Sequence, residues 1–496
     1  MRGERSVALL VFAAALAFYT LTAGGSLTST DAVVTFDLTR SIVEHRSLAL
    51  SGNLLGSEQN RGVDGRYYSQ WGLGHSLYNV PFYVAGKMAA ALLGRPVGKP
   101  DTIPKAAVAL GSAAAGAGAV CFIWLLAFRI TGHARAALVA ALSAAVASPL
   151  WPYSRFGFST ALTAMILTAA AWLLWLAAER GRAAEAAAAG GVVAFGWLTR
   201  HEMALAIAPF ALFLVISARR RQLPAADLAR QAGAFAGCAA VGGILWLLYN
   251  VVRFGSATQV GYTPAFGTEG YAAFLVAPGG SVVLFCPIAL LWAVGVWRAR
   301  RAAPVAPFLL AGPLLVFYGF FGALADWPGG RSYGPRYLVS SLILLAPGAA
   351  LLWAHGGRRV RQAVAGAILV AAVLQLPGVL VDYSKVSVAW ARAATEEQVA
   401  ARNWRMSSSP LVLNARDAIR RVPENARYLT GRSSPPPVRD AFDRDFSQQF
   451  SFSLDFWWLY LHYFGVLNAA AAAGIAMTLL ATATALAVAA WRRAGP

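Results

Sequence analysis

The chain has 496 residues, of which 58% are apolar and only 13% are charged. Soluble proteins carry about 25% charged residues, so this composition excludes an ordinary soluble enzyme. The net charge of +20 would suit a nucleic-acid partner in a soluble protein. Here the arginines stand in clusters between apolar runs, as the positive-inside rule and attraction to anionic membrane lipid require. We therefore predict an all-α polytopic membrane protein with no nucleic-acid partner.

Twelve apolar runs are long enough, or nearly so, to cross a bilayer core of about 30 Å. These runs are residues 7–27, 105–128, 135–150, 157–178, 184–197, 203–217, 228–251, 281–297, 303–325, 337–354, 361–381 and 467–491. A further run, 75–93, contains His75 and Lys87, which favour a helix lying in the membrane plane. Twelve crossings place every arginine cluster and both termini in the cytoplasm. We predict about twelve transmembrane helices, and a crossing by 75–93 would add one.

This topology divides the chain into three parts. Residues 1–381 form a transmembrane module, whose first extracytoplasmic loop, 28–104, carries the in-plane helices. Residues 382–466 form a small extracytoplasmic segment, and 467–496 form the last transmembrane helix and a cytoplasmic tail. The interiors of the apolar runs hold essentially no ionisable residue, which argues against an ion or proton path through the membrane. Any reaction is therefore expected at the outer rim.

The first loop opens with Ser29, Thr30 and Asp31. Val33, Phe36 and Arg40 then recur at a spacing of three to four residues, which predicts an amphipathic helix along the membrane surface. Asp31 stands at the start of this helix and has two interpretations. Its carboxylate either caps the helix or is a general base held at the membrane–water boundary.

Residues 62–81 combine an Asp64–Gly65 turn with Arg66, Tyr67, Tyr68, Gln70, Trp71 and His75. The aromatic side chains suit either a surface on which a sugar stacks or an anchor at the lipid headgroups. Gly72 and Gly74 allow a close approach of the backbone to a neighbour.

Later loops supply arginines. Residues 326–337 contain several glycines and prolines together with Arg331, Tyr333 and Arg336, and Arg253 follows the run 228–251. Guanidinium groups suit bidentate contact with phosphate, and the alternative is that they reach lipid headgroups. Between two short runs, Arg200 and Glu202 are expected to pair with each other.

Together these motifs resemble the GT-C superfamily of integral-membrane glycosyltransferases, near the protein O-mannosyltransferases and the bacterial transferases that put aminoarabinose on lipid A. In that superfamily an acid, often one of a pair, follows the first span and begins an in-plane helix. Residues 31–40 match this pattern in spacing, with Asp37 at a second acidic position. Residues 65–76, 249–255 and 327–337 resemble further family segments, so the resemblance covers roughly residues 1–381.

The resemblance implies a glycosyltransferase of the bacterial inner membrane that acts on the extracytoplasmic face. It would move a sugar from a polyprenyl-phosphate donor to a hydroxyl of a glycan, lipid or protein acceptor, with inversion at the anomeric carbon. Asp31 would be the catalytic base. The implied substrate-binding residues are Asp37, Arg66, Tyr67, Gln70, His75, Arg253, Arg331, Tyr333 and Arg336.

Two positions depart from the family pattern. Ala32 replaces the second acid of the paired motif, and one carboxylate is a poor cage for Mg²⁺ or Mn²⁺. We therefore assign no metal ligand, and the resemblance leaves a divalent metal cofactor open. Gln70 stands where a lysine beside the donor phosphate is expected, so one of the arginines must supply that charge.

Two other classes of function remain compatible with the sequence. The first is a flippase or transporter of lipid-linked sugars, which would need polar residues along its spans. The second is a non-catalytic membrane scaffold that binds a partner through residues 382–466.

Overall fold

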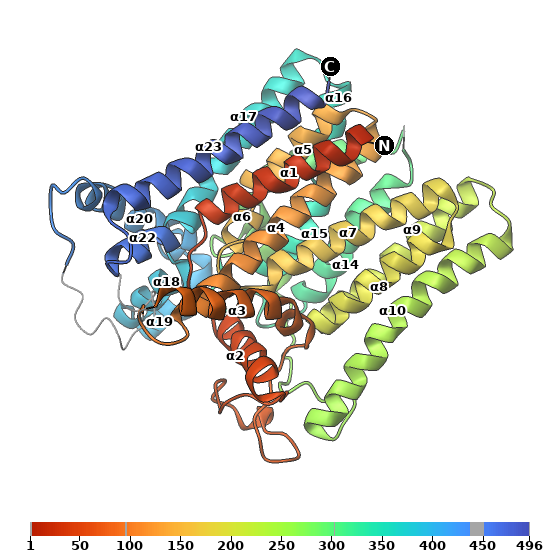
Figure 1. Cartoon of the computed structure of the whole chain (residues 1–496). Helices are drawn as coiled ribbons and strands as arrows, with labels where there is room; N and C mark the ends of the chain where they lie inside the picture. The colour runs from red at the N-terminus through yellow and green to blue at the C-terminus, as the bar shows by residue number, and fades with distance from the viewer. Residues whose placement is uncertain (1, 95–96, 302, 437–450, 496) are drawn as a thin grey trace.

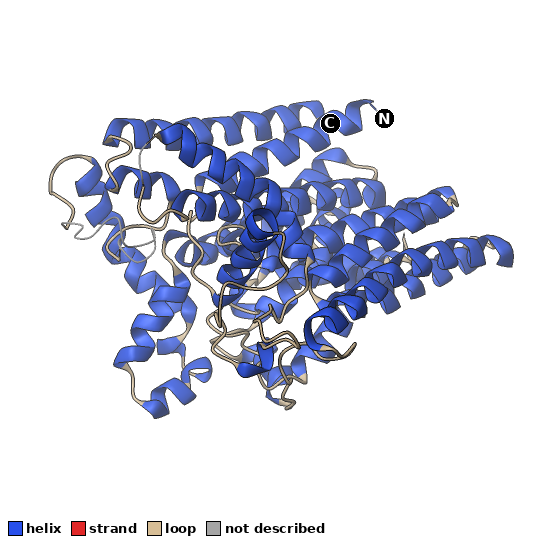
Figure 2. Ribbon diagram, turned by 60° about the horizontal axis from the view of Figure 1, so that its bottom comes forward, coloured by secondary structure: helices blue, strands red, loops and turns tan. Residues whose placement is uncertain are grey.

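The computed structural model describes residues 2–94, 97–301, 303–436 and 451–495. Within these residues every regular element is a helix and none is a strand. Both termini lie at one end of a helical bundle (Figure 1), and the long connecting loops gather away from them (Figure 2). The predicted segment 382–466 includes residues 437–450, which lie outside the described residues.

Eight candidate spans are long and apolar enough to cross a membrane in the described part of the chain. They are α1 (Arg2–Leu21), α4 (Thr102–Thr131), α7 (Ser159–Arg180), η2 with α9 (His201–Ala206, Ile207–Arg220), α10 (Ala225–Phe254), α15 with η3 and α16 (Arg336–Leu342, Ile343–Leu345, Pro347–His355), α17 (Arg358–Leu380) and α23 (Ala469–Arg493). The shorter apolar helices are α5 (Ala134–Val146), α8 (Ala183–Thr199), α13 (Ile288–Ala299) and α14 (Ala306–Gly322).

Together these helices coincide with the twelve predicted runs. The protein is therefore a multi-pass membrane protein, as predicted, while the number of crossings stays a prediction. In the predicted first loop, α3 (Gly74–Leu93) does not qualify as a candidate span by the same measure of length and composition.

The remaining helices lie mainly in the loops. They are α2 (Thr30–His45), η1 (Glu58–Asn60), α6 (Leu150–Tyr153), α11 (Glu269–Val276), α12 (Val282–Phe285), α18 (Tyr383–Ala393), α19 (Glu396–Ala400), η4 (Arg402–Trp404), η5 (Met406–Ser408), α20 (Pro410–Leu429) and α22 (Trp457–Tyr463). The helix predicted after the first span is thus present as α2. Its orientation in the membrane plane stays a prediction.

The helices α8 and α10 pack together at unusually short range because small residues face each other. A Cβ atom added to Gly242 of α10 would lie 2.5 Å from the Cα atom of Ala194. One added to Gly190 of α8 would lie 2.2 Å from the carbonyl oxygen of Phe235. Since both helices lead into the site described below, this contact sets where their ends lie.

We predict that Gly242→Leu lowers the thermal unfolding midpoint of the purified protein. The new side chain has no room unless α8 and α10 separate, and overpacking of this kind costs about 1–3 kcal/mol. Gly237, on the same helix, is the control, since its added Cβ would meet no atom within 4 Å. Gly237→Leu should unfold at or above the wild-type midpoint, because leucine favours a helix over glycine. Equal losses in both variants would contradict the close packing.

Candidate functional site

Asp31 lies in the first turn of α2 and does not cap that helix. The cap is Ser29, whose hydroxyl oxygen accepts a hydrogen bond of 3.1 Å from the backbone N–H of Ala32. A carboxylate in the first turn is favoured by the helix dipole. The side chain of Asp31 is 22% exposed, and its carboxylate is not used to cap the helix.

Two guanidinium groups from distant parts of the chain meet this carboxylate. Arg336, the first residue of α15, donates a hydrogen bond from Nη2 to Oδ2 of Asp31. The Nη1 atom of Arg200, which connects α8 to η2, lies 3.9 Å from the same oxygen. The fold therefore brings the acid of the first loop together with Arg336, which is one of the arginines predicted for the site, and with Arg200, which was not predicted there.

Arg336 is buried, and its own contacts fix its direction. Nη1 donates to the carbonyl oxygen of Gly329 at 3.1 Å, and the guanidinium carbon lies 4.3 Å from the ring centre of Phe158. The Nε atom is buried and has no hydrogen-bond partner among the described residues. Buried donors without a partner are rare in folded proteins.

The Asp31 carboxylate and both arginines line a cavity of about 840 Å³. Its walls come from α2, the 70–71 turn, η2, α10, the 258–266 segment and the ends of α14 and α15. The lining residues are Asp31, Gln70, Trp71, Arg200, His201, Glu202, Trp246, Thr258, Gln259, Val260, Tyr262, Thr263, Pro264, Ala265, Phe266, Phe320, Phe321, Leu324, Asp326, Gly329, Gly330, Arg336 and Tyr337.

One wall of the cavity was not predicted as part of the site. Arg200 is hydrogen-bonded to Glu202, as the sequence predicts, but both also face the cavity. His201 Nε2 lies 2.7 Å from the hydroxyl of Tyr262, and its ring packs against Trp246. The sequence feature that could have indicated this wall is the run of three ionisable residues, 200–202, between two apolar runs. The 258–266 segment carries no comparable signal.

Ionisable groups near the cavity respond to burial. Burial is the largest influence on Asp326 and raises the pKa of its carboxyl. The hydroxyl of Tyr337, which donates to this carboxyl at 3.4 Å, opposes that effect and lowers the pKa. His75 lies in the first turn of α3, is almost wholly buried and is not a lining residue. Burial, and then the charge of Arg200, lower the pKa of His75 to about 4. The imidazole is therefore neutral at physiological pH.

The turn before α3 lies tightly against the end of α8. A Cβ atom added to Gly72 would lie 2.0 Å from the carbonyl oxygen of Leu198, and one added to Gly74 would lie 2.6 Å from Oγ1 of Thr199. The predicted close approach at these glycines is thus present. It brings Gln70 and Trp71 beside Arg200.

Several predicted site residues lie elsewhere and are bound to other residues of the first loop. Asp37 is buried and binds Arg40 and both the N–H and the hydroxyl of Ser51, at 2.8 and 2.9 Å. Arg66 is exposed and pairs with Asp64 at 2.7 Å. Tyr67 donates to Glu58 at 2.8 Å. None of these predicted residues lines the cavity.

Arg253 is also directed away from the cavity. Its buried guanidinium donates to the carbonyl oxygens of Ser69 and Trp71 and to Oδ1 of Asn250. It therefore holds the turn that presents Gln70 and Trp71. Arg253 itself is not among the residues that line the cavity.

The predicted site residues of the 326–337 loop lie in different places. Arg336 lines the cavity, whereas Tyr333 is fully buried and donates to the carbonyl oxygen of Leu374 at 2.6 Å. Arg331 is exposed and is not among the lining residues. Within the described residues, no three His, Cys, Asp or Glu side chains are placed to hold a metal ion.

The comparisons with known proteins concern the family and the fold. A family model described as dolichyl-phosphate-mannose-protein mannosyltransferase matches residues 103–246, under a third of the chain. No curated protein matches the chain.

Among solved structures, ArnT from Cupriavidus metallidurans in the apo state is 16% identical, with a TM-score of 0.50 over 99% of this chain and 76% of that one. ArnT bound to undecaprenyl phosphate is 17% identical, with a TM-score of 0.49 over 98% and 77%. The Archaeoglobus fulgidus oligosaccharyltransferase is 12% identical, with a TM-score of 0.43 over 89% and 61%. The chain shares the fold of ArnT. Together with the family match, this confirms the predicted resemblance to the GT-C superfamily.

We predict that Arg253→Gln destabilises the protein. The shorter amide leaves carbonyl oxygens of the 69–71 turn without donors, and each such loss costs about 1–3 kcal/mol. The thermal unfolding midpoint should fall by several degrees. Arg66→Gln is the control, because an exposed pair contributes about 0–1 kcal/mol. A variant of Arg253 as stable as that control would show that the turn is held by other contacts.

Proposed function

We propose that the protein is a glycosyltransferase that moves a sugar from a polyprenyl-phosphate donor to an acceptor hydroxyl in the cavity around Asp31. The observation that carries this proposal is the meeting of Asp31 and Arg336 at the cavity wall. The match to a family named for a dolichyl-phosphate-mannose donor supports the class of donor. The shared fold with ArnT supports the same class of enzyme.

Arg336 is the proposed phosphate ligand. A guanidinium has five N–H donors, and those of Nη1 and Nη2 contact Gly329 and Asp31 while Nε has no partner in the described structure. A phosphate oxygen that reaches this guanidinium from the cavity would place the leaving group next to a fixed positive charge. Arg200 adds a second positive charge on the same side of the carboxylate.

Asp31 is the proposed general base. It takes the proton from the acceptor hydroxyl while the hydroxyl oxygen bonds to the anomeric carbon of the sugar. The bond from that carbon to the phosphate oxygen breaks, and the electron pair stays on the phosphate. Arg336 stabilises the charge that develops there. Attack from the side opposite the phosphate inverts the anomeric carbon.

The remaining polar and aromatic lining suits a sugar. The indole rings of Trp71 and Trp246 and the ring of Tyr262 line the cavity, and sugars stack on such faces. Gln70 and Glu202 offer hydrogen-bonding groups to hydroxyls. The proposed acceptor is a glycan, a lipid or a protein.

The proposed reaction takes place on the extracytoplasmic face of a bacterial inner membrane. The support is the positive-inside rule, which places the arginine clusters in the cytoplasm. The loop that carries Asp31 then lies on the opposite face. Both termini lie at one end of the bundle, with the two largest loop segments away from them (Figure 1).

We predict that Asp31→Asn reduces sugar transfer by about 100-fold or more, the usual contribution of a general base. The assay uses polyprenyl-phosphate mannose as donor and isolated bacterial membranes as the source of acceptors. The variant should still bind undecaprenyl phosphate, because Arg336 is retained. Glu58→Gln, which changes an exposed acid of the same loop, should transfer at the wild-type rate. Full activity of the Asp31 variant would remove this residue from the mechanism.

We also predict that Arg336→Gln weakens binding of undecaprenyl phosphate by about tenfold, as expected for the loss of one charge-assisted hydrogen bond. Arg358→Gln, at an exposed position at the start of α17, is the matched control and should bind normally. Binding is measured by displacement of a fluorescent polyprenyl phosphate in detergent. Equal affinities of the two variants would contradict the placement of the phosphate.

A further inference from the structure

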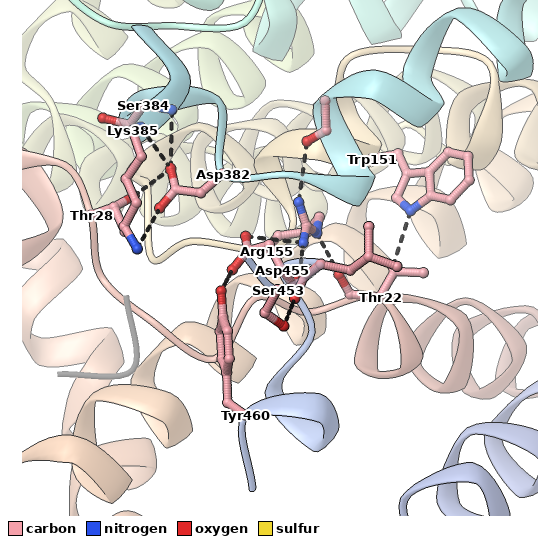
Figure 3. A network of polar contacts seen from close by, with 12 residues as sticks. Thr22, Thr28, Trp151, Arg155, Asp382, Ser384, Lys385, Ser453, Asp455 and Tyr460 are labelled. Carbon is pink, nitrogen blue, oxygen red and sulfur yellow. Dashed lines mark hydrogen bonds and ion pairs between the residues drawn. The ribbon is translucent and has the colours of Figure 1, made fainter. Parts of the chain in front are cut away.

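Residues 22–28 connect α1 to α2 and lead directly into the first turn of α2, which carries Asp31. The connection contains no helix, and a chain of this kind needs outside contacts to hold one position. Figure 3 shows a network of polar contacts that meets it, with side chains from four separate parts of the sequence. The contacts of this network lie outside the cavity lining and have no part in the proposed chemistry.

Arg155, which follows α6, is the centre of the network and is fully buried. Its Nε donates to the carbonyl oxygen of Thr22, and Nη1 donates to that of Gly378 at 3.1 Å. Nη2 donates to the backbone oxygen of Asp455 and contacts its carboxylate at 3.2 Å. One guanidinium thus joins the end of α1, the end of α17 and the segment before α22.

The segment 453–458 covers the end of α1. The backbone N–H of Trp457 donates to the carbonyl oxygen of Ala23 at 3.0 Å. The indole N–H groups of Trp457 and Trp458 donate to the carbonyl oxygens of Thr20 and Leu21, at 2.7 and 2.9 Å. The last carbonyls of a helix have few partners within the helix, and these donors bind the carbonyl oxygens at and just after the end of α1.

Two glycines make this contact possible. A Cβ atom on Gly24 would lie 2.8 Å from Oδ2 of Asp455, and one on Gly25 would lie 2.5 Å from Cβ of Trp457. Gly25 also has a φ of +68°, which disfavours other residues. The connection is therefore shaped to receive the segment 453–458.

A second contact holds the other end of the connection. The hydroxyl of Thr28 donates to Oδ1 of Asp382 at 3.3 Å, one residue before the cap of α2. Asp382 itself caps α18 by accepting from the backbone N–H of Ser384 at 3.0 Å. Burial, and then the nearby carboxylate of Asp455, raise the pKa of Asp382 to about 6. Residues 20–28 are thus held at both ends by the region that follows α17.

We propose that the segment 453–458, together with Asp382, is a positioning element that holds the carboxylate of Asp31 against Arg336. Asp455, Trp457 and Thr28 are positioning residues, since each acts on Asp31 through the 22–28 connection. This inference rests on the proposed function and assigns a role to the region 382–466. On this proposal the region is not an independent domain, because its contacts position a residue of the proposed active site.

The test uses two variants that each remove one hydrogen bond of the network, Trp457→Phe and Thr28→Val. Amide hydrogen exchange of residues 22–32 in the full-length protein should become faster in both variants, because this exchange reports local opening. The turnover rate of transfer should fall by about tenfold, while the affinity for undecaprenyl phosphate stays within twofold of wild type. A displaced base slows the chemical step and leaves the phosphate site intact.

Two controls separate positioning from general stability. Thr28→Ser keeps the hydroxyl and should restore wild-type exchange and turnover. Tyr463→Phe removes a hydroxyl that donates to Asn425 at 2.7 Å, in the same region, and should change neither measurement. Unchanged exchange in Trp457→Phe and Thr28→Val, or equal effects in Tyr463→Phe, would overturn the inference. A wild type without transfer activity contradicts the proposed function alone, and the exchange measurement then still decides whether this segment fixes the connection.

Discussion

The arrangement of the site depends on one ion pair, between Asp31 and Arg336, whose partners are 305 residues apart in the sequence. Burying a guanidinium is costly unless its charge and its donors are satisfied, and here the carboxylate and the carbonyl oxygen of Gly329 serve this purpose. The pair therefore has to be held from both sides. The Ser29 cap and the 22–28 connection hold Asp31. The glycine-rich loop before α15 holds Arg336.

The spans and the acid could be predicted from the sequence because each depends on local pattern. Length and apolarity alone give the apolar helices of the bundle, and the position of Asp31 after the first of them follows from chain order. The partner of the acid could be predicted only as one of several arginines. Arg253, Arg331 and Arg336 have similar neighbours in the sequence, so chain order cannot decide which of them faces the cavity. That choice depends on tertiary contacts that bring together residues more than 100 positions apart.

The arginines also show why residue type alone does not give function. Arg253 and Arg155 direct their donors at backbone carbonyl oxygens, at Ser69 and Trp71 in one case and at Thr22, Gly378 and Asp455 in the other. Both are buried and both fasten loops. Arg336 differs because one of its donors has no partner in the described part of the chain. For these three arginines the contacts of the guanidinium decide: Arg253 and Arg155 bind backbone carbonyl oxygens, whereas Arg336 lines the cavity and contacts Asp31.

The dependence of the α1 end on residues 453–458 has a consequence for biosynthesis. A ribosome makes the chain from its amino end, and domains generally fold in that order. Here the first helix leaves the ribosome early, whereas the tryptophans that bind its last carbonyls are synthesised after almost all of the bundle. The arrangement of the first loop can thus be completed only late in translation. A chain that ends upstream of this point would lack the tryptophan donors that bind the end of α1.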